Sequence, residues 1–413
     1  MTDKFCASLC RHFILILLVT SPLVSANDIV DWQLADYALA GVPYEIQVGK
    51  PEMVVPDKLE HLGGLVQKSN NNVAITMYKG ELFVAFRTSK NHFASKYSHI
   101  LVVRSRDFSH FILDGDFTLG RDLREPHFLE YEGKLNLIFT ALGTSAITFK
   151  PGQSYRSTRL ATSNWQAVSP ILGAGEIIWD LKKRYGSYYL TSYSGPHYDI
   201  FGESRIQAHF KKTQDGVNFE NVAGVPFIYQ GGVSEIGFEF DLLGNVFGVT
   251  RNEDGDQSGF GSHIVSAPAY NLGEWHFPPH AQKNIYESPK MFRFGKDLFL
   301  IGRKNLARKP FGRASSKLPL FMQRLVNWIG YSLTAKTTAL YKLDTSKNEL
   351  IHISDLPGTG DNCFPSIVRL SPTRFLVANY TSPLDKKKIS WIRGQLSKTS
   401  IYLITIDFKL RPK

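Results

Sequence analysis

Glutamate and arginine recur in this chain 16 residues apart. Two segments begin with glutamate and end with arginine, Glu235 to Arg251 and Glu287 to Arg303, and a third segment of the same length ends at Arg87. An arginine guanidinium binds a planar carboxylate through two parallel hydrogen bonds. Paired carboxyl groups carry out the acid and base steps that break a glycosidic bond. These residue types therefore indicate a site for hydrolysis of a bond to an acidic sugar.

The pairs belong to a repeat that runs along the chain. Six segments of 17 residues each contain a short apolar strand, a turn that often includes glycine, and a second strand that ends in a polar residue. They are residues 71–87, 125–141, 177–193, 235–251, 287–303 and 364–380. Because the strands of a hairpin are antiparallel, the first and last residues of each segment are expected at the same end.

Two more strands are expected after each hairpin, for example 98–105 and 110–113 after the first and 262–268 and 273–277 after the fourth. A repeat of about 50 residues with four strands predicts a β-propeller. We therefore expect an all-β fold, a six-bladed β-propeller that forms a single domain over residues 27–413. A strand from within 30–56 is expected to close the last blade.

The fifth repeat contains an insertion at 304–335. From Leu298 to Leu343 the chain has nine basic residues and no acidic residue. Apolar side chains recur there at helical spacing, at Leu318, Phe321, Leu325, Trp328 and Ile329. The pattern predicts a basic, partly helical insertion in blade 5. It is typical of a peripheral contact with an anionic membrane or with lipopolysaccharide, and equally of a helix that caps the propeller and has a solvated basic flank.

The innermost strands of a propeller line its axis, so equivalent hairpin ends should meet in one funnel. We expect catalytic and substrate-binding groups at that end. The candidate catalytic residues are Glu235, Glu287, Asp180, Glu125, Tyr380 and His92. The candidate substrate-binding residues are Arg87, Arg251, Arg303, Arg124 and Tyr193. The alternative is a set of ion pairs that join neighbouring blades without chemistry.

Other motifs predict no metal or cofactor. Residues 252–256 are rich in acids but lack the full ligand pattern of a calcium loop, and the histidines lack zinc-ligand spacing. Residues 213–219, with a looser copy at 105–111, match an aspartate-containing turn that stabilises outer strands. We do not expect nucleic acid as a partner, because the excess positive charge is concentrated in one insertion.

The first 26 residues contain Lys4 and Arg11, an apolar run at 13–19, and small residues before Asn27. This pattern predicts a secretory signal peptide over 1–26, with an uncleaved membrane anchor as the alternative. We therefore expect an exported protein, either periplasmic or extracellular. It would also be associated with the membrane if the insertion 304–335 contacts lipid. The formal charge of +11 favours anionic partners. We expect a monomer, or a protein that works with an unidentified partner protein.

The six-bladed pattern, the aspartate-containing turns and the funnel arginines together resemble the sialidase superfamily of glycoside hydrolases, over most of residues 60–408. Arg87, in the sequence FRTSKN, is similar to the family's active-site arginine at the end of the first hairpin. Arg251 and Arg303 are similar to two members of the arginine triad that binds the substrate carboxylate. Glu235 is similar to the glutamate that assists the nucleophile.

Three residues of the family pattern have no direct counterpart in this chain. The first triad arginine is replaced around residues 72–74, and the nucleophilic tyrosine is replaced by Phe364 in the sequence NCFPSI. The acid/base aspartate is not evident, and His92 is the nearest titratable group. A simple sialidase mechanism therefore does not carry over unchanged.

The resemblance implies a glycosidase that releases an acidic 2-keto-3-deoxy sugar, such as sialic acid or the 3-deoxy-manno-octulosonic acid of lipopolysaccharide. Glu235 or Glu287 would be the base or nucleophile, or Tyr380 or Tyr193 would replace the missing tyrosine. The proton donor would be Asp180, Glu125 or His92. One alternative is a non-catalytic propeller that binds a glycan or a protein. Another is a furanosidase-type propeller that uses three acids.

Overall fold

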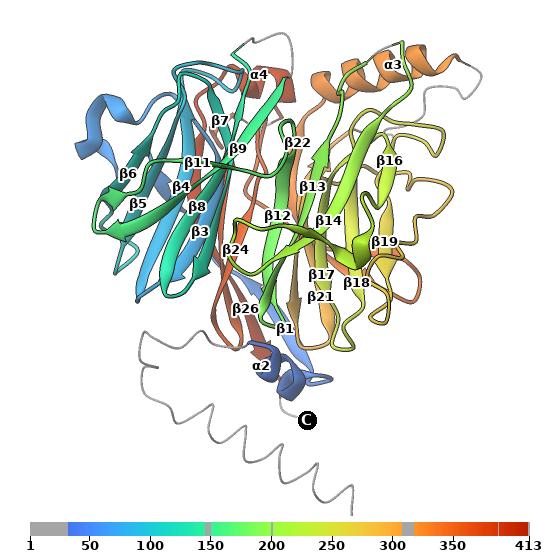
Figure 1. The fold of residues 1–413 in the computed structure, drawn as a ribbon, viewed down its shortest axis with the longest axis horizontal. Coiled ribbons are helices and arrows are strands. Elements are labelled where there is room, and N and C mark those ends of the chain that lie inside the picture. Colours follow the sequence, from blue (N-terminus) through green and yellow to red (C-terminus); the bar gives the residue numbers. More distant parts are fainter. Residues whose placement is uncertain (1–31, 145–149, 200, 308–317, 387, 412–413) are drawn as a thin grey trace, which may run out of the picture.

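The computed structural model describes residues 32–144, 150–199, 201–307, 318–386 and 388–411. Within these residues the strands form six antiparallel sheets arranged around one axis (Figure 1). The expected all-β fold, a six-bladed β-propeller, is confirmed. The predicted signal peptide at 1–26 lies outside the described residues.

The first three blades each start with their innermost strand and continue outward. Blade 1 contains β3 (Ser69–Tyr78), β4 (Glu81–Ser89), β5 (His99–Ser105) and β6 (Ile112–Phe117). Blade 2 contains β7 (Asp122–Tyr131), β8 (Lys134–Leu142) and β9 (Pro151–Ala161), with β10 (Asn164–Trp165) and β11 (Ser169–Ile171) beside β9. Blade 3 contains β12 (Ile177–Arg184), β13 (Ser187–Ser194) and β14 (Ile206–Thr213), with β15 (Glu220–Asn221) and β16 (Tyr229–Gly231) beside β14.

The other three blades follow the same order. Blade 4 contains β17 (Val233–Phe240), β18 (Val246–Asn252) and β19 (Ile264–Ala267). Blade 5 contains β20 (Glu287–Phe294), β21 (Asp297–Asn305), β22 (Lys336–Asp344) and β23 (Glu349–Leu356). Blade 6 contains β24 (Ser366–Ser371), β25 (Arg374–Thr381) and β26 (Ser400–Leu410).

The predicted fourth strand of blade 4, at 273–277, is wrong. Only one bridge remains there, between Ser266 and His276. The chain instead makes a turn, in which the amide of Glu274 donates to the carbonyl of Asn271 at 3.1 Å. The Trp275 indole then closes the turn by donating to a nearby carbonyl and packing against the blade.

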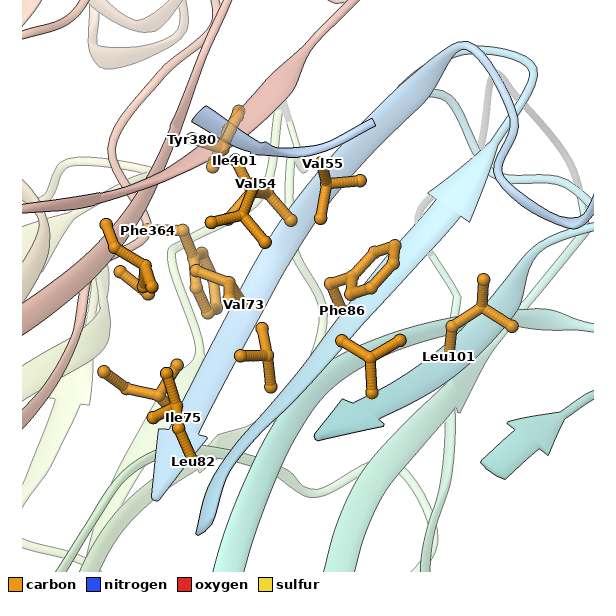
Figure 2. Close-up of a cluster of buried hydrophobic side chains, with 14 of the residues drawn as sticks. Val54, Val55, Val73, Ile75, Leu82, Phe86, Leu101, Phe364, Tyr380 and Ile401 are labelled. Atoms are coloured by element: carbon orange, nitrogen blue, oxygen red, sulfur yellow. The ribbon is translucent and has the colours of Figure 1, made fainter. Parts of the chain in front are cut away.

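The N-terminal segment closes the ring as predicted. β1 (Tyr44–Val48) and β2 (Glu52–Val55) both pair antiparallel with β26. Figure 2 shows Val54 and Val55 in the buried cluster with Phe364, Tyr380 and Ile401 of the last blade. Complete burial of such a side chain stabilises the fold by about 1.5–3 kcal/mol. Apolar packing therefore joins the start of the propeller to its end.

Different helices lie at the two ends of the propeller (Figure 1). At one end lies α2 (Trp32–Leu39), whose Asp36 pairs with Arg293 at 3.0 Å and with Arg369 at 2.8 Å. At the other end lie α3 (Leu320–Leu333) and α4 (Trp391–Gln395). Two short 3-10 helices are η1 (Glu60–Leu65) and η2 (Val222–Gly224). No helix in the described part of the chain has both the length and the apolar character to cross a membrane.

The helix expected within the insertion 304–335 is confirmed as α3, which lies between β21 and β22 of blade 5. Residues 308–317 of that insertion lie outside the described ranges. The aspartate-containing turns are also confirmed. Asp215 accepts the amides of Val217 and Asn218, both at 2.8 Å, and Asp107 accepts the amide of Ser109 at 2.9 Å.

The 17-residue segments fix the hairpin register. Asn71 pairs with Arg87, and Glu287 pairs with Arg303, as predicted. Five innermost strands (β3, β7, β12, β17 and β20) also contain a β-bulge near their first residues. A bulge removes a residue from the ladder and re-aims its side chain. The bulges therefore turn side chains toward the axis at the same end of five blades.

Three bulge residues adopt positive φ without being glycine. Asn72, Glu125 and Ser288 have φ of 48°, 55° and 50°, a conformation that costs about 1–3 kcal/mol per residue. The expected pairing of Glu125 with Ala141 is wrong. The bulge adds one residue to β7 between Arg124 and His127, so that Ala141 pairs with Leu123 and Glu125 leaves the ladder.

Candidate active site

Packed rings fill the axis beside the candidate site. Trp179 is completely buried, and its ring centroid lies 4.9 Å from that of Phe364 across the axis. Its Nε1–H donates to the carbonyl of Pro289 at 2.9 Å. These rings fill the centre of the propeller, and the candidate residues lie at the end of it that carries α3 and α4.

Arg251 is bound by three carboxylates. Its Nη1 lies 2.7 Å from Glu235, its Nη2 2.9 Å from Glu253 and its Nε 3.3 Å from Glu287. Glu287 also pairs with Arg303 at 3.0 Å. Burial, together with the charges of Glu253 and Glu287, raises the pKa of Glu235 to about 7. Glu235 can therefore change its protonation state near neutral pH.

Glu253 has a lowered pKa, whereas Glu235 has a raised one. Burial opposes ionisation, but Arg251 and groups on His197 and Tyr198 hold the pKa of Glu253 well below its usual range. The Tyr198 hydroxyl donates to Oε1 of Glu253, and Nδ1 of His197 lies 3.3 Å from Oε2. The sequence did not predict Glu253 as a site residue, because it follows the fourth hairpin segment and lies outside the repeat.

Glu125 is a buried carboxyl group with an unpaired oxygen. Its Oε2 receives no hydrogen bond from the described residues. Burial, and then the charge of Glu235, raises the pKa of Glu125 to about 8. Glu125 is therefore protonated at neutral pH, beside an acid that titrates near 7. Neighbouring carboxyl groups held in different protonation states can act as general acid and general base.

The charges of Glu125 and Glu235 also act on Tyr193. Burial, and then the charges of Glu125 and Glu235, raises the pKa of Tyr193 well above its ordinary value. The hydroxyl is therefore a neutral donor and not a nucleophile prepared by ionisation. This places Tyr193 with the acids of blades 2 and 4.

Tyr380 and His92 share a different carboxylate. The Tyr380 hydroxyl donates to Oδ1 of Asp361 at 2.8 Å, and Nδ1 of His92 lies 2.6 Å from Oδ2. Burial and Asp361 raise the pKa of Tyr380 well above its ordinary value, whereas burial lowers the pKa of His92. A neutral histidine is a poor proton donor. Asp361 was missed in the sequence, since it lies outside the hairpin segments.

Arg87 and Arg124 share Asp122. Nη2 of Arg87 lies 2.7 Å from Oδ1, and Nε of Arg124 lies 2.5 Å from Oδ2. Arg87 also donates from Nη1 to the carbonyl of Asn91 at 3.2 Å, and Arg124 donates to the carbonyl of His92. Both guanidinium groups are therefore engaged inside the protein.

Arg303 is engaged in the same way. Its Nε donates to the carbonyl of Asn362 at 2.7 Å, and its Nη2 to the carbonyl of Cys363 at 3.3 Å. Its Nη1 donates to Glu287 and to the hydroxyl of Tyr331 at 2.8 Å. Arg303 therefore joins blade 5 to the segment before β24 and to α3.

Asp180 lies among lysines. Its carboxylate is 3.0 Å from Lys182 and 3.2 Å from Lys290. Burial opposes ionisation, but the two lysines lower the pKa of Asp180. A charged, paired carboxylate does not suit the role of proton donor.

α3 covers this cluster. The Trp328 indole donates to the carbonyl of Glu253 at 3.2 Å, and the Tyr331 hydroxyl accepts from Arg303. Beneath the helix, beside Arg251 and Glu287, is a cavity of about 90 Å³. Pockets for small-molecule ligands span roughly 300–1,000 Å³. This cavity is therefore smaller than an ordinary ligand pocket.

A larger cavity, of about 560 Å³, lies beside α2 at the opposite end. It is lined by residues such as Tyr44, Phe294 and Lys342, and by none of the candidate residues. Within the described ranges, no group of three or more His, Cys, Asp or Glu side chains is placed to hold a metal ion.

No protein-family model matches the chain, and no curated protein matches its sequence. Solved structures do match. A protein of unknown function from Dyadobacter fermentans DSM 18053 aligns with a TM-score of 0.60 at 12% identity, over 89% of this chain and 99% of that one. The phage phi92 endosialidase aligns with a TM-score of 0.55 at 10% identity, over 90% and 70% of the two chains.

A sialidase from Trypanosoma rangeli aligns with a TM-score of 0.54 at 9% identity, over 82% of this chain and 55% of that chain. These likenesses show that the chain has a sialidase-like six-bladed propeller fold. The expected resemblance to sialidases is confirmed at the level of the fold.

Proposed function

We propose that the protein is an exported glycosidase that hydrolyses the bond to an acidic 2-keto-3-deoxy sugar. Sialic acid and the 3-deoxy-manno-octulosonic acid of lipopolysaccharide are the two substrates of this class to test. The observation that carries the proposal is the buried pair of Glu125 and Glu235, with pKa values raised to about 8 and about 7. Two fold neighbours are named as a sialidase and an endosialidase, and the apolar run at 13–19 supports export.

Glu125 and Glu235 have different roles in the proposed reaction. Glu125, protonated at neutral pH, gives its proton to the leaving glycosidic oxygen; its Oε2 has no hydrogen-bond partner among the described residues. Glu235, when ionised, accepts a proton from the attacking water or attacks the sugar directly. Arg251 is a positioning residue, because its Nη1 holds Glu235 at 2.7 Å.

Arg303 binds the substrate by exchanging one hydrogen-bond partner, the Tyr331 hydroxyl, for the substrate carboxylate. Nη1 of Arg303 now donates to the Tyr331 hydroxyl of α3. When α3 moves to admit a sugar, it releases that donor at the same time. A substrate carboxylate can then replace the hydroxyl and form the stronger, charge-assisted bond.

The first experiment measures free sugar acid by mass spectrometry after incubation with sialosides and with lipopolysaccharide that carries outer octulosonic acid. We expect release by the wild type, and a loss of about 100-fold or more in kcat for Glu125→Gln and for Glu235→Gln. The matched control is Glu349→Gln, an exposed glutamate on β23, which should keep full activity. Release that is unchanged in Glu125→Gln would contradict the assigned roles.

The pH profile provides a second test of the same pair. The active form has Glu235 ionised and Glu125 protonated. The value of kcat/KM should therefore rise as pH passes about 7 and fall as it passes about 8, with both limbs belonging to the pair. A profile that is flat from pH 6 to pH 9 would exclude this pair as the acid and base.

A non-catalytic propeller that binds a glycan or a protein is the second candidate function. It is favoured by the complete engagement of Arg251, each of whose guanidinium nitrogens already faces a carboxylate. In that case neither sugar panel yields free sugar acid. Calorimetry would still detect binding, and Glu235→Gln would leave it within about twofold of the wild type, because no proton transfer is involved.

A further inference from the structure

α3 turns its apolar side toward solvent. Six of its large apolar side chains are exposed, among them Ile329 at 57% and Leu333 at 64%. The six are Phe321, Met322, Leu325, Val326, Ile329 and Leu333. The apolar face of a surface helix normally faces the core of its own protein. Here the arrangement is reversed.

Polar anchors on the inner side hold the helix in this orientation. Arg324, Asn327 and Tyr331 are the buried residues of α3. Arg324, the single charged residue of the helix, donates to the carbonyl of Asp199 at 2.9 Å and to the hydroxyl of Ser204 at 2.7 Å. Rotating the apolar side inward would expose these groups and break their bonds. These contacts therefore favour the outward orientation of the apolar face.

The apolar surface continues beyond the helix. The Phe201 side chain is 84% exposed, and its ring centroid lies 5.8 Å from that of Phe321. On the other side α4 packs on α3, where the amide of Trp391 donates to the carbonyl of Thr334 at 3.0 Å. Leu396, just after α4, is also exposed. A contiguous exposed apolar patch of this kind marks an interaction site.

On the α4 side of this patch the charges are mostly positive, whereas Asp199 and Glu203 are exposed beside Phe201. The described residues of the segment 385–398 expose four basic side chains and one acidic side chain. The basic side chains are Lys386, Lys388, Arg393 and Lys398, and the acidic one is Asp385. An apolar face with adjacent lysine and arginine is the pattern of a helix that lies in the surface of an anionic membrane.

We propose that the outer face of α3, together with Phe201 and the basic segment around α4, binds the surface of a lipid bilayer that contains anionic lipid. The apolar side chains enter the boundary between headgroups and acyl chains, and the basic side chains contact the headgroups. A lipid surface fits this face because the apolar side chains match the acyl boundary and the adjacent basic side chains match anionic headgroups.

Vesicle sedimentation tests the proposal with the intact protein. The probes are vesicles of phosphatidylcholine alone and vesicles of phosphatidylcholine with phosphatidylglycerol. We expect binding to the anionic vesicles, and a loss of about tenfold or more in the partition coefficient for the double variant Leu325→Gln, Ile329→Gln. The double variant Arg393→Gln, Lys398→Gln should lose the preference for anionic vesicles and much of the dependence on salt.

The matched control is Leu243→Gln. Leu243 is 80% exposed in the turn between β17 and β18, and the carbonyl of its neighbour Leu242 accepts from Tyr37 of α2 at the opposite end. This variant should bind as the wild type does. Because all the replaced side chains are exposed, thermal melting should be unchanged in every variant. A shared melting curve excludes unfolding as the cause of lost binding.

Two results would overturn the proposal. One is equal binding of wild type and the Leu325→Gln, Ile329→Gln variant to anionic vesicles, or no binding by either. The other is self-association, measured by light scattering, that this variant abolishes, because the face would then serve a second copy of the chain. Neither result depends on glycosidase activity, so this test and the test of the proposed function fail separately.

Discussion

Replacing Glu125 by glutamine should change how stability depends on pH. The pKa of Glu125 is raised from 4.5 to about 8, chiefly by burial and then by Glu235. Below pH 4.5 Glu125 carries its proton in both the folded and the unfolded state, so it adds no pH dependence to the free energy of unfolding. As pH rises from 4.5 to 8, the unfolded state releases a proton that the folded state keeps. The free energy of unfolding therefore falls across this window and levels off above it.

The size of the effect follows from the shift. One pKa unit corresponds to about 1.4 kcal/mol. Between pH 5 and pH 8 Glu125 alone should lower the free energy of unfolding of the wild type by about 3–4 kcal/mol. Since the side chain is buried, solvent screening reduces this value little. Glutamine resembles the protonated acid in shape and has no proton to lose, so the variant lacks this decline.

Urea unfolding at pH 5, 6, 7 and 8 measures the difference. The stability of Glu125→Gln relative to the wild type should increase by about 3 kcal/mol from the lowest pH to the highest. Glu349→Gln serves again as the control, and its curve should run parallel to that of the wild type. If the difference between Glu125→Gln and the wild type stays constant within about 1 kcal/mol over this range, then Glu125 is ionised in the folded protein and the reasoning fails.

Three further substitutions test the structural framework by urea unfolding at one pH. Asp36→Asn should cost about 3 kcal/mol or more, because buried Arg293 and Arg369 lose their counter-charge; a cost below about 1 kcal/mol would mean that α2 does not secure the blades. Ile401→Ala should lower the free energy of unfolding by about 2–5 kcal/mol, because it opens a cavity where the ring closes. An unchanged free energy of unfolding would contradict this role of Ile401. Trp179→Phe should cost about 1–3 kcal/mol, because a buried carbonyl loses its donor; unchanged stability would show that water replaces the indole.

The fold was predictable because its signals are local and repeated. The equal lengths of the hairpins fixed both the number of blades and the ends that meet, and the pairings of Asn71 with Arg87 and of Glu287 with Arg303 confirm that register. The fourth strand of blade 4 was not predictable in this way. Its sequence suits a strand, but the turn at 271–274 curls the chain before a ladder forms.

The site was only partly predictable, for a physical reason. The repeat identified which arginines and glutamates meet, but their partners come from positions outside the repeat. Asp122 precedes the second hairpin segment and Glu253 follows the fourth, so periodicity gave neither residue. The sequence did not predict the pKa shifts either. Glu125 and Asp180 are both buried, and they differ in the charges that the fold places nearby, Glu235 beside the first and two lysines beside the second.

The bulges and the ion pairs together explain how the cluster can hold so many charges. Each bulge takes a side chain out of its ladder, and in three of the five a residue with positive φ adds a cost in backbone strain. Removing one partner of a buried ion pair is costly, so the arginines stay saturated while α3 is in place. Tyr331 is a neutral partner, so its departure leaves the ion pair of Arg303 with Glu287 in place and frees one position on Nη1 for a carboxylate. Under the proposed function, a covered site of this kind favours a substrate that carries its own carboxylate, because a carboxylate forms a stronger, charge-assisted bond to the freed Nη1 than a neutral hydroxyl does.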